Sequence, residues 1–106
     1  MKRYKLADFT KGWFIGSFQP TLYQTSSVEV GVKYHTAGED YGAHYQKIAT
    51  EYNVMVEGRM KIGEEWFTKG DIFVIPPGEI VKPHFYTDCV VVVVKIPSIN
   101  TDKVEV

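Results

Sequence analysis

The sequence is short of cysteine, of surplus positive charge and of long apolar runs, and each shortage excludes a class of protein. The single cysteine, Cys89, cannot form a disulfide within the chain, which favours a reducing compartment. A net charge of −1 gives no electrostatic footprint for nucleic acid or for an anionic membrane. The longest apolar run, residues 89–94, is far shorter than a membrane span. We therefore expect a small-molecule ligand and neither a nucleic-acid nor a membrane partner.

Length and composition indicate one globular domain over residues 1–106. A chain of 106 residues is long enough to enclose a single core, and a hydrophobic content of 44% with 24% charged residues is ordinary for a globular protein. The first twelve residues, MKRYKLADFTKG, carry positive charge but lack the apolar segment of a secretion signal. The expected location is therefore cytoplasmic.

Short strands separated by turns account for most of the chain. No stretch shows a sustained helical period, and about nine short strands are separated by turn signals at the spacing typical of a β-sandwich or barrel. Residues 28–35 alternate, with apolar side chains on one face and Glu29, Lys33 and His35 on the other. This alternation predicts a half-buried strand with His35 on its polar, solvent-facing side. The polar tail, residues 97–106, predicts no particular structure.

The stretch from Gly38 to Gly58 carries the strongest functional pattern. His44 and Gln46 are two residues apart on an expected strand and therefore share one face. Glu51 opens the next apolar segment, and a hairpin turn at residues 47–50 would direct it back across that pair. The sequence therefore predicts that an imidazole, an amide and a carboxylate converge on one point.

This stretch resembles the first cupin motif, which is a glycine, five residues, His-x-His, three or four residues, a glutamate, six residues and a glycine. Gly38, His44, Glu51 and Gly58 fall on that spacing, and Gln46 occupies the position of the second histidine.

A second stretch resembles the second cupin motif, which is a glycine, five residues, Pro-x-Gly, two residues, a histidine, three residues and an asparagine. Its glycine and Pro-x-Gly positions fit, at Gly70, Pro76 and Gly78. The histidine position is Val81. His84 follows three residues later, and Asp88 follows at about the place of the asparagine.

The resemblance implies an all-β fold, a single cupin-type jelly-roll barrel, and a homodimer, which is common among small cupins. It also implies a divalent transition metal (Fe, Mn, Ni or Zn) inside the barrel, held by His44 and Glu51 with Gln46 assisting. His84 completes this set if the loop before it bulges far enough to bring it into the barrel.

The function implied is the binding of a small polar or carbohydrate-like ligand in the barrel, and two enzymatic alternatives stay open. Residues 44–47, His-Tyr-Gln-Lys, are similar to a segment of metal-free sugar-nucleotide isomerases and epimerases of the cupin type. In that alternative His44 and Glu51 act as catalytic base and acid. A metal-dependent oxygenase is the other alternative, and a non-catalytic binding protein is the competing class.

Overall fold

The computed structural model describes residues 1–106 and consists almost entirely of β-structure. Two short 3-10 helices, η1 and η2, precede ten strands. Their bounds are η1 Leu6–Asp8, η2 Thr10–Gly12, β1 Trp13–Ile15, β2 Glu29–His35, β3 His44–Gln46, β4 Thr50–Glu57, β5 Arg59–Ile62, β6 Glu65–Thr68, β7 Ile72–Ile75, β8 Pro83–Phe85, β9 Cys89–Ile96 and β10 Lys103–Glu105. The predicted all-β class is thereby confirmed. No helix in the chain is both long and apolar enough to cross a membrane.

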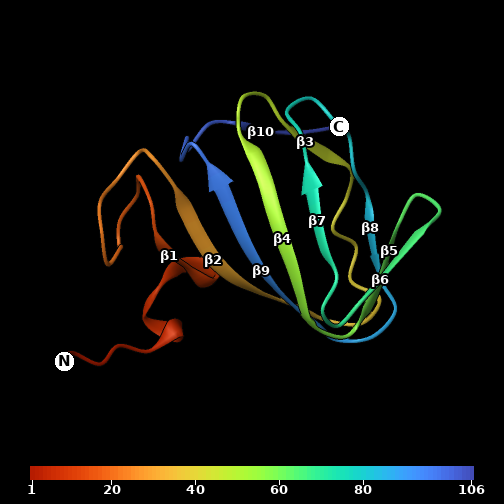
Figure 1. Ribbon diagram of the computed structural model, residues 1–106, viewed down its shortest axis with the longest axis horizontal. Helices are drawn as coiled ribbons and strands as arrows, with labels where there is room; N and C mark the ends of the chain where they lie inside the picture. Colours follow the sequence, from red (N-terminus) through yellow and green to blue (C-terminus); the bar gives the residue numbers. More distant parts are fainter.

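Five antiparallel strands form the larger sheet, in the order β1-β2-β9-β4-β7 (Figure 1). The opposite side of the barrel consists of the pair β10-β3 and the three-stranded sheet β6-β5-β8. A single backbone bridge between His44 and Val81 connects these two smaller groups. The chain therefore encloses an interior between one large sheet and two small ones.

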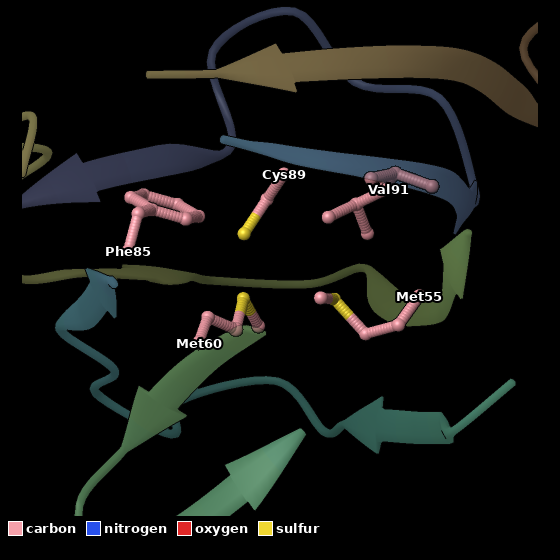
Figure 2. Packing of buried hydrophobic residues seen from close by; sticks show 6 residues of the cluster. Met55, Met60, Phe85, Cys89 and Val91 are labelled. Carbon is pink, nitrogen blue, oxygen red and sulfur yellow. The ribbon is translucent and has the colours of Figure 1, made fainter. Parts of the chain in front are cut away.

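The apolar core occupies one end of this interior. Six buried side chains from both sides of the barrel pack together there, namely Met55, Met60, Phe85, Cys89, Val91 and Val93. Figure 2 shows the two methionines, which come from β4 and β5, facing Phe85, Cys89 and Val91 from β8 and β9. Thioether chains fill irregular space well, which suits the place where two sheets with different strand directions meet. The rest of the interior is more polar.

The side chains of the larger sheet are distributed in an unexpected way. In β2, Glu29 and Gly31 are buried, whereas Tyr34 is 70% exposed. The predicted alternation is present, but the polar side of the strand faces the interior and the apolar side faces outwards. The expectation that His35 points to solvent was therefore wrong, because it lies on the inward side of β2 with a side chain only 10% exposed.

The C-terminal tail has a defined role. It contributes β10, which pairs with β3, and it buries the carboxylate of Asp102. That carboxylate accepts hydrogen bonds from the backbone N–H groups of Ile48 and Ala49, both at 2.8 Å. These two residues form the link between β3 and β4. The tail thus fixes the turn that positions His44 relative to Glu51.

Candidate ligand-binding site

A cavity of about 910 Å³ lies between the large sheet and the two small ones. It is large enough to enclose most of a small organic ligand. Residues of the N-terminal segment, including Phe9 and Lys11, also line it. All three residues of the predicted convergence, His44, Gln46 and Glu51, contribute to its wall.

Strand β3 presents two buried polar side chains to this cavity. His44 is 7% exposed and Gln46 is 3% exposed. β10 pairs with β3, while the backbone N–H and C=O of His44 pair with those of Val81 at 3.0 and 2.9 Å. Two buried atoms have no hydrogen-bond partner, His44 Nδ1 and Gln46 Oε1. Because buried polar atoms are almost always satisfied in folded proteins, these two atoms indicate a place where a ligand or water binds.

Glu51 supplies a negative charge near this pair. It lies near the start of β4, and its Oε2 accepts a hydrogen bond from Asn53 Nδ2 at 3.2 Å. Burial lowers the pKa of His44, and the charge of Lys103 lowers it further, whereas a backbone hydrogen bond with Gly42 and the charge of Glu51 oppose the change. His44 is therefore a neutral imidazole at neutral pH, able to accept a proton or a hydrogen bond.

An aromatic wall adjoins His44. The ring of Tyr41 packs edge-on against His44, with ring centroids 5.1 Å apart, and against His35 at 5.2 Å. His35 stacks on Phe85 at 4.1 Å, and its Nδ1 lies 3.2 Å from Glu39 Oε2. Burial raises the pKa of Tyr41, and the charge of Glu51 adds to that effect. The contact with Glu39 and the stacking on Phe85 fix His35 as part of the wall.

Lysines line the part of the cavity near Trp13. The ring of Trp13 lies over Gly31, where an added Cβ would come within 2.5 Å of it. Lys33 and Lys95 each place Nζ 4.8 Å from the centroid of a Trp13 ring. Lys103 lies opposite Gln46 in the β10-β3 pair and also lines the cavity. Sequence analysis did not identify these lysines or Trp13 as site residues, although Lys33 shares the polar face of β2 with His35.

His84 does not join this site. On β8 the side chains of Pro83 and Phe85 are buried, so the intervening His84 points outwards and is exposed. The loop before it does not bulge, and Val81 stays directly opposite His44, 5% exposed. The second-motif position thus lies beside His44, as the motif spacing requires, but it carries a side chain that cannot ligate a metal.

The donors in the cavity do not fit a divalent transition metal. Nowhere in the chain do three or more histidine, cysteine, aspartate or glutamate side chains form a group able to hold one. His44 and Glu51 offer two strong ligands, and Gln46 adds only a neutral amide oxygen. Positively charged lysines along the same wall oppose binding of a cation. The metal set predicted from the sequence, His44, Gln46, Glu51 and His84, is therefore not assembled.

No protein-family model matches this sequence, and no curated protein matches it. Solved structures are similar to it. An uncharacterized conserved protein with a double-stranded β-helix domain from Klebsiella pneumoniae has a TM-score of 0.73 at 13% identity, covering 98% of this chain and 90% of that one. A cupin-2 domain containing protein from Shewanella frigidimarina has a TM-score of 0.58 at 18% identity, covering 70% of this chain and 74% of that one.

The DMSP lyase DddQ from Ruegeria pomeroyi is also similar, with a TM-score of 0.69 at 22% identity. The match covers 93% of this chain but only 54% of the lyase, so this chain spans about half of that enzyme's length. At such identities these likenesses show a shared fold and leave ligand and activity open.

Proposed function

We propose that this chain, which has the cupin fold, binds a small polar, carbohydrate-like ligand in its cavity without a metal ion. The observation that carries the proposal is the pair of buried, unpartnered atoms, His44 Nδ1 and Gln46 Oε1. A ligand hydroxyl group that donates to Gln46 Oε1 and accepts from His44 protonated at Nδ1 would satisfy both, and the Tyr41 ring provides a flat surface beside them. The Glu51 carboxylate can accept a hydrogen bond from a further ligand hydroxyl, because Asn53 occupies only one of its oxygens.

The metal-dependent alternatives have less support. A site with Fe, Mn, Ni or Zn at His44, Gln46, Glu51 and His84 would need the His84 imidazole inside the barrel, and that side chain is exposed. The oxygenase hypothesis depends on the same ligands and loses support with them.

Metal-free isomerisation or epimerisation of a sugar is the second candidate function. The lowered pKa of His44 favours it, because a neutral imidazole can take a proton from the carbon next to a sugar carbonyl. In this mechanism His44 as base takes the carbon-bound proton, leaving an enediolate and an imidazolium. Glu51 as acid gives its proton to the neighbouring carbon and recovers a proton from the imidazolium. Binding and catalysis are distinguished by whether a bound sugar is converted to product.

A thermal-shift screen with neutral and acidic sugars tests the binding proposal. Bound ligand should raise the melting temperature of the native protein, since it binds the folded state alone. His44→Ala and Gln46→Ala should each abolish that shift, whereas the control His84→Ala should retain it. Elemental analysis of protein purified without a tag completes the test. Near-stoichiometric transition metal that His44→Ala removes would contradict the metal-free proposal.

We also propose that the protein is a homodimer that pairs through the outer face of its large sheet. Cross-strand partners on that face form continuous apolar rows, such as Val30, Val94, Tyr52 and Val74. Ile72 is 70% exposed there and Val74 is 51% exposed. Monomeric proteins rarely expose a contiguous apolar patch of this kind, and a two-fold axis would let the same face cover itself.

A further inference from the structure

The cavity wall has more positive charge than the chain as a whole. Four lysines and two glutamates line it, although the complete sequence has a net charge of −1. Of the two glutamates, Glu39 pairs with His35 and Glu51 accepts a hydrogen bond from Asn53. Local carboxylates therefore compensate only part of the positive charge of the cavity.

Three of these lysines, Lys33, Lys95 and Lys103, form what we call the lysine cluster. Lys95 has a carboxylate nearby, since its Nζ lies 3.8 Å from Glu29 Oε2. Neither Lys33 nor Lys103 has a carboxylate within 4.0 Å. Lys33 Nζ donates to a neutral acceptor, the carbonyl oxygen of Lys11, and Lys103 Nζ donates to the hydroxyl oxygen of Tyr41 at 3.3 Å. Two of the three ammonium groups thus lack an anionic partner.

The ammonium groups are held in place, which distinguishes them from mobile surface lysines. Trp13 packs over Gly31, and Lys33 and Lys95 each lie over a ring of Trp13. Burial lowers the pKa of Lys33 to about 8, and the nearby charge of Lys95 contributes to that change. Crowding of like charges in a partly buried wall costs free energy, which a bound anion would recover.

The lysine cluster is continuous with the unpartnered atoms of β3. Lys103 is the register partner of Gln46, and its charge is felt at His44, where it lowers the imidazole pKa. A ligand a few ångströms long can therefore place one end among the lysines and the other at His44 and Gln46.

We propose that the cavity selects an organic anion, a small polar molecule whose carboxylate or phosphate lies within the lysine cluster while its hydroxyl groups meet His44 and Gln46. This inference rests on the proposed binding function and names its ligand class. The anionic group bonds Lys33 and Lys103, which lack carboxylate partners, and Lys95, whose Nζ also lies over a ring of Trp13, adds charge. Charge-assisted hydrogen bonds of this kind are stronger than neutral ones.

Calorimetric titration with three probes that share one sugar ring tests this selection. Glucose is neutral, glucuronate adds a carboxylate and glucose 6-phosphate adds a phosphate. At least one anion should bind about tenfold or more tightly than glucose, and the difference should shrink as salt is added. The anion that binds more tightly shows whether the cavity prefers a carboxylate or a phosphate.

Variants of the lysine cluster test whether these lysines cause the preference for an anion. Lys33→Met and Lys103→Met should each reduce anion affinity about tenfold and glucose affinity by much less, and the exposed control Lys69→Met should behave as the native protein. Glucose binding as tight as that of both anions would overturn the proposal. So would anion affinity that survives both substitutions.

Two outcomes separate this inference from the proposed function. If glucose and the anions bind equally and His44→Ala abolishes all binding, the binding function stands and the anion preference fails. If Lys33→Met abolishes anion binding but His44→Ala and Gln46→Ala do not, the lysine cluster binds anions and the proposed polar site fails.

A probe without a sugar keeps the test decisive. Acetate and inorganic phosphate are titrated into protein with ¹³C-labelled lysine side chains, and the ¹³Cε resonances are assigned with the same variants. Saturable shifts at Lys33 and Lys103, with none at Lys69, support the proposal. Shifts no larger than those of Lys69 overturn it.

Discussion

The inner and outer faces of the large sheet have opposite character, and the more polar one is inside. Inward positions of β2, β9 and β4 carry Glu29, Lys33, Lys95, Glu51 and Asn53, together with the apolar residues of the core end. Outward positions of the same strands carry valine, isoleucine and tyrosine, several of them well exposed. A strand alternates side chains whichever way it faces, so alternation alone does not say which side is buried. In this protein the polar side of the sheet lines the cavity, and the apolar side faces outwards.

A charge placed on the outer face of the large sheet should weaken the proposed dimer, and this is the largest effect that we predict. Ile72→Glu adds a carboxylate to the proposed dimer interface, on its strand β7, where burial in apolar surroundings is costly. We expect the dissociation constant of the dimer to rise about a thousandfold, which corresponds to about 4 kcal/mol. Sedimentation over a range of concentrations measures it.

Ile80→Glu is the matched control, since Ile80 is 58% exposed but lies outside the large sheet. It should leave the dimer intact. If the native protein is monomeric at high concentration, the proposal that the outer face forms a dimer interface is wrong.

Histidines added to the cavity should bind a metal ion more tightly than a histidine placed on the outer face of the sheet. Gln46→His together with Val81→His would add to His44 and Glu51 the two histidines that this chain lacks at the cupin-motif positions. We expect affinity for Zn²⁺ to increase at least about a hundredfold, measured by calorimetry on protein without a tag.

The control moves one imidazole to the outer face by combining Gln46→His with Val90→His. It should gain much less affinity, since Val90 lies on the opposite side of the sheet. Equal gains from both pairs would mean that Val81 does not face His44 across a shared site.

The anchor of the β3–β4 turn tests how the inner face is positioned. Asp102→Ala removes the acceptor for one buried and one partly buried backbone N–H group, so the free energy of unfolding should fall by about 3 kcal/mol. Asp102→Asn keeps one acceptor oxygen and should lose less. Urea denaturation measures both. A loss below about 0.5 kcal/mol for the alanine variant would show that the turn forms without this carboxylate.

The smallest effect concerns Lys33 and pH. Its pKa is about 8 in the folded protein against 10.5 in the unfolded chain, so the folded state carries a cost that is complete below pH 8. Between pH 8 and 10.5 the unfolded chain binds more protons, and the free energy of unfolding therefore rises with pH.

Lys33→Met should remove that rise and stabilise the protein near pH 7 by on the order of 1 kcal/mol, a figure reduced for the side chain's partial exposure. Lys69→Met is the control, and urea denaturation at several pH values measures both. If the free energy of unfolding has the same pH profile in both variants, the Lys33 ammonium group is solvated in the folded protein and the prediction is wrong.

Much of the fold was predictable because its signals are local. Turn residues and short alternating segments specify strands, and the two motif spacings placed Val81 opposite His44. They also put Glu51 in the same cavity as His44 and Gln46, although residues 47–50 join strands of two different sheets and do not form the expected hairpin. These spacings succeed because strand geometry fixes how far apart in space residues of known separation lie. The predicted entry of His84 failed for the same reason, since alternation on β8 turns it outwards.

The sequence by itself determined the strand pattern, the shared face of His44 and Gln46, and the absence of two of the histidines that a cupin metal site needs. Only the tertiary structure decided which side of each strand faces the cavity, because that choice depends on the facing sheet and not on the strand itself. It alone brought Lys33 to the same cavity as Lys95 and Lys103, which lie far along the chain from it. It also turned the unremarkable tail into β10, since the burial of Asp102 requires N–H donors more than fifty residues away.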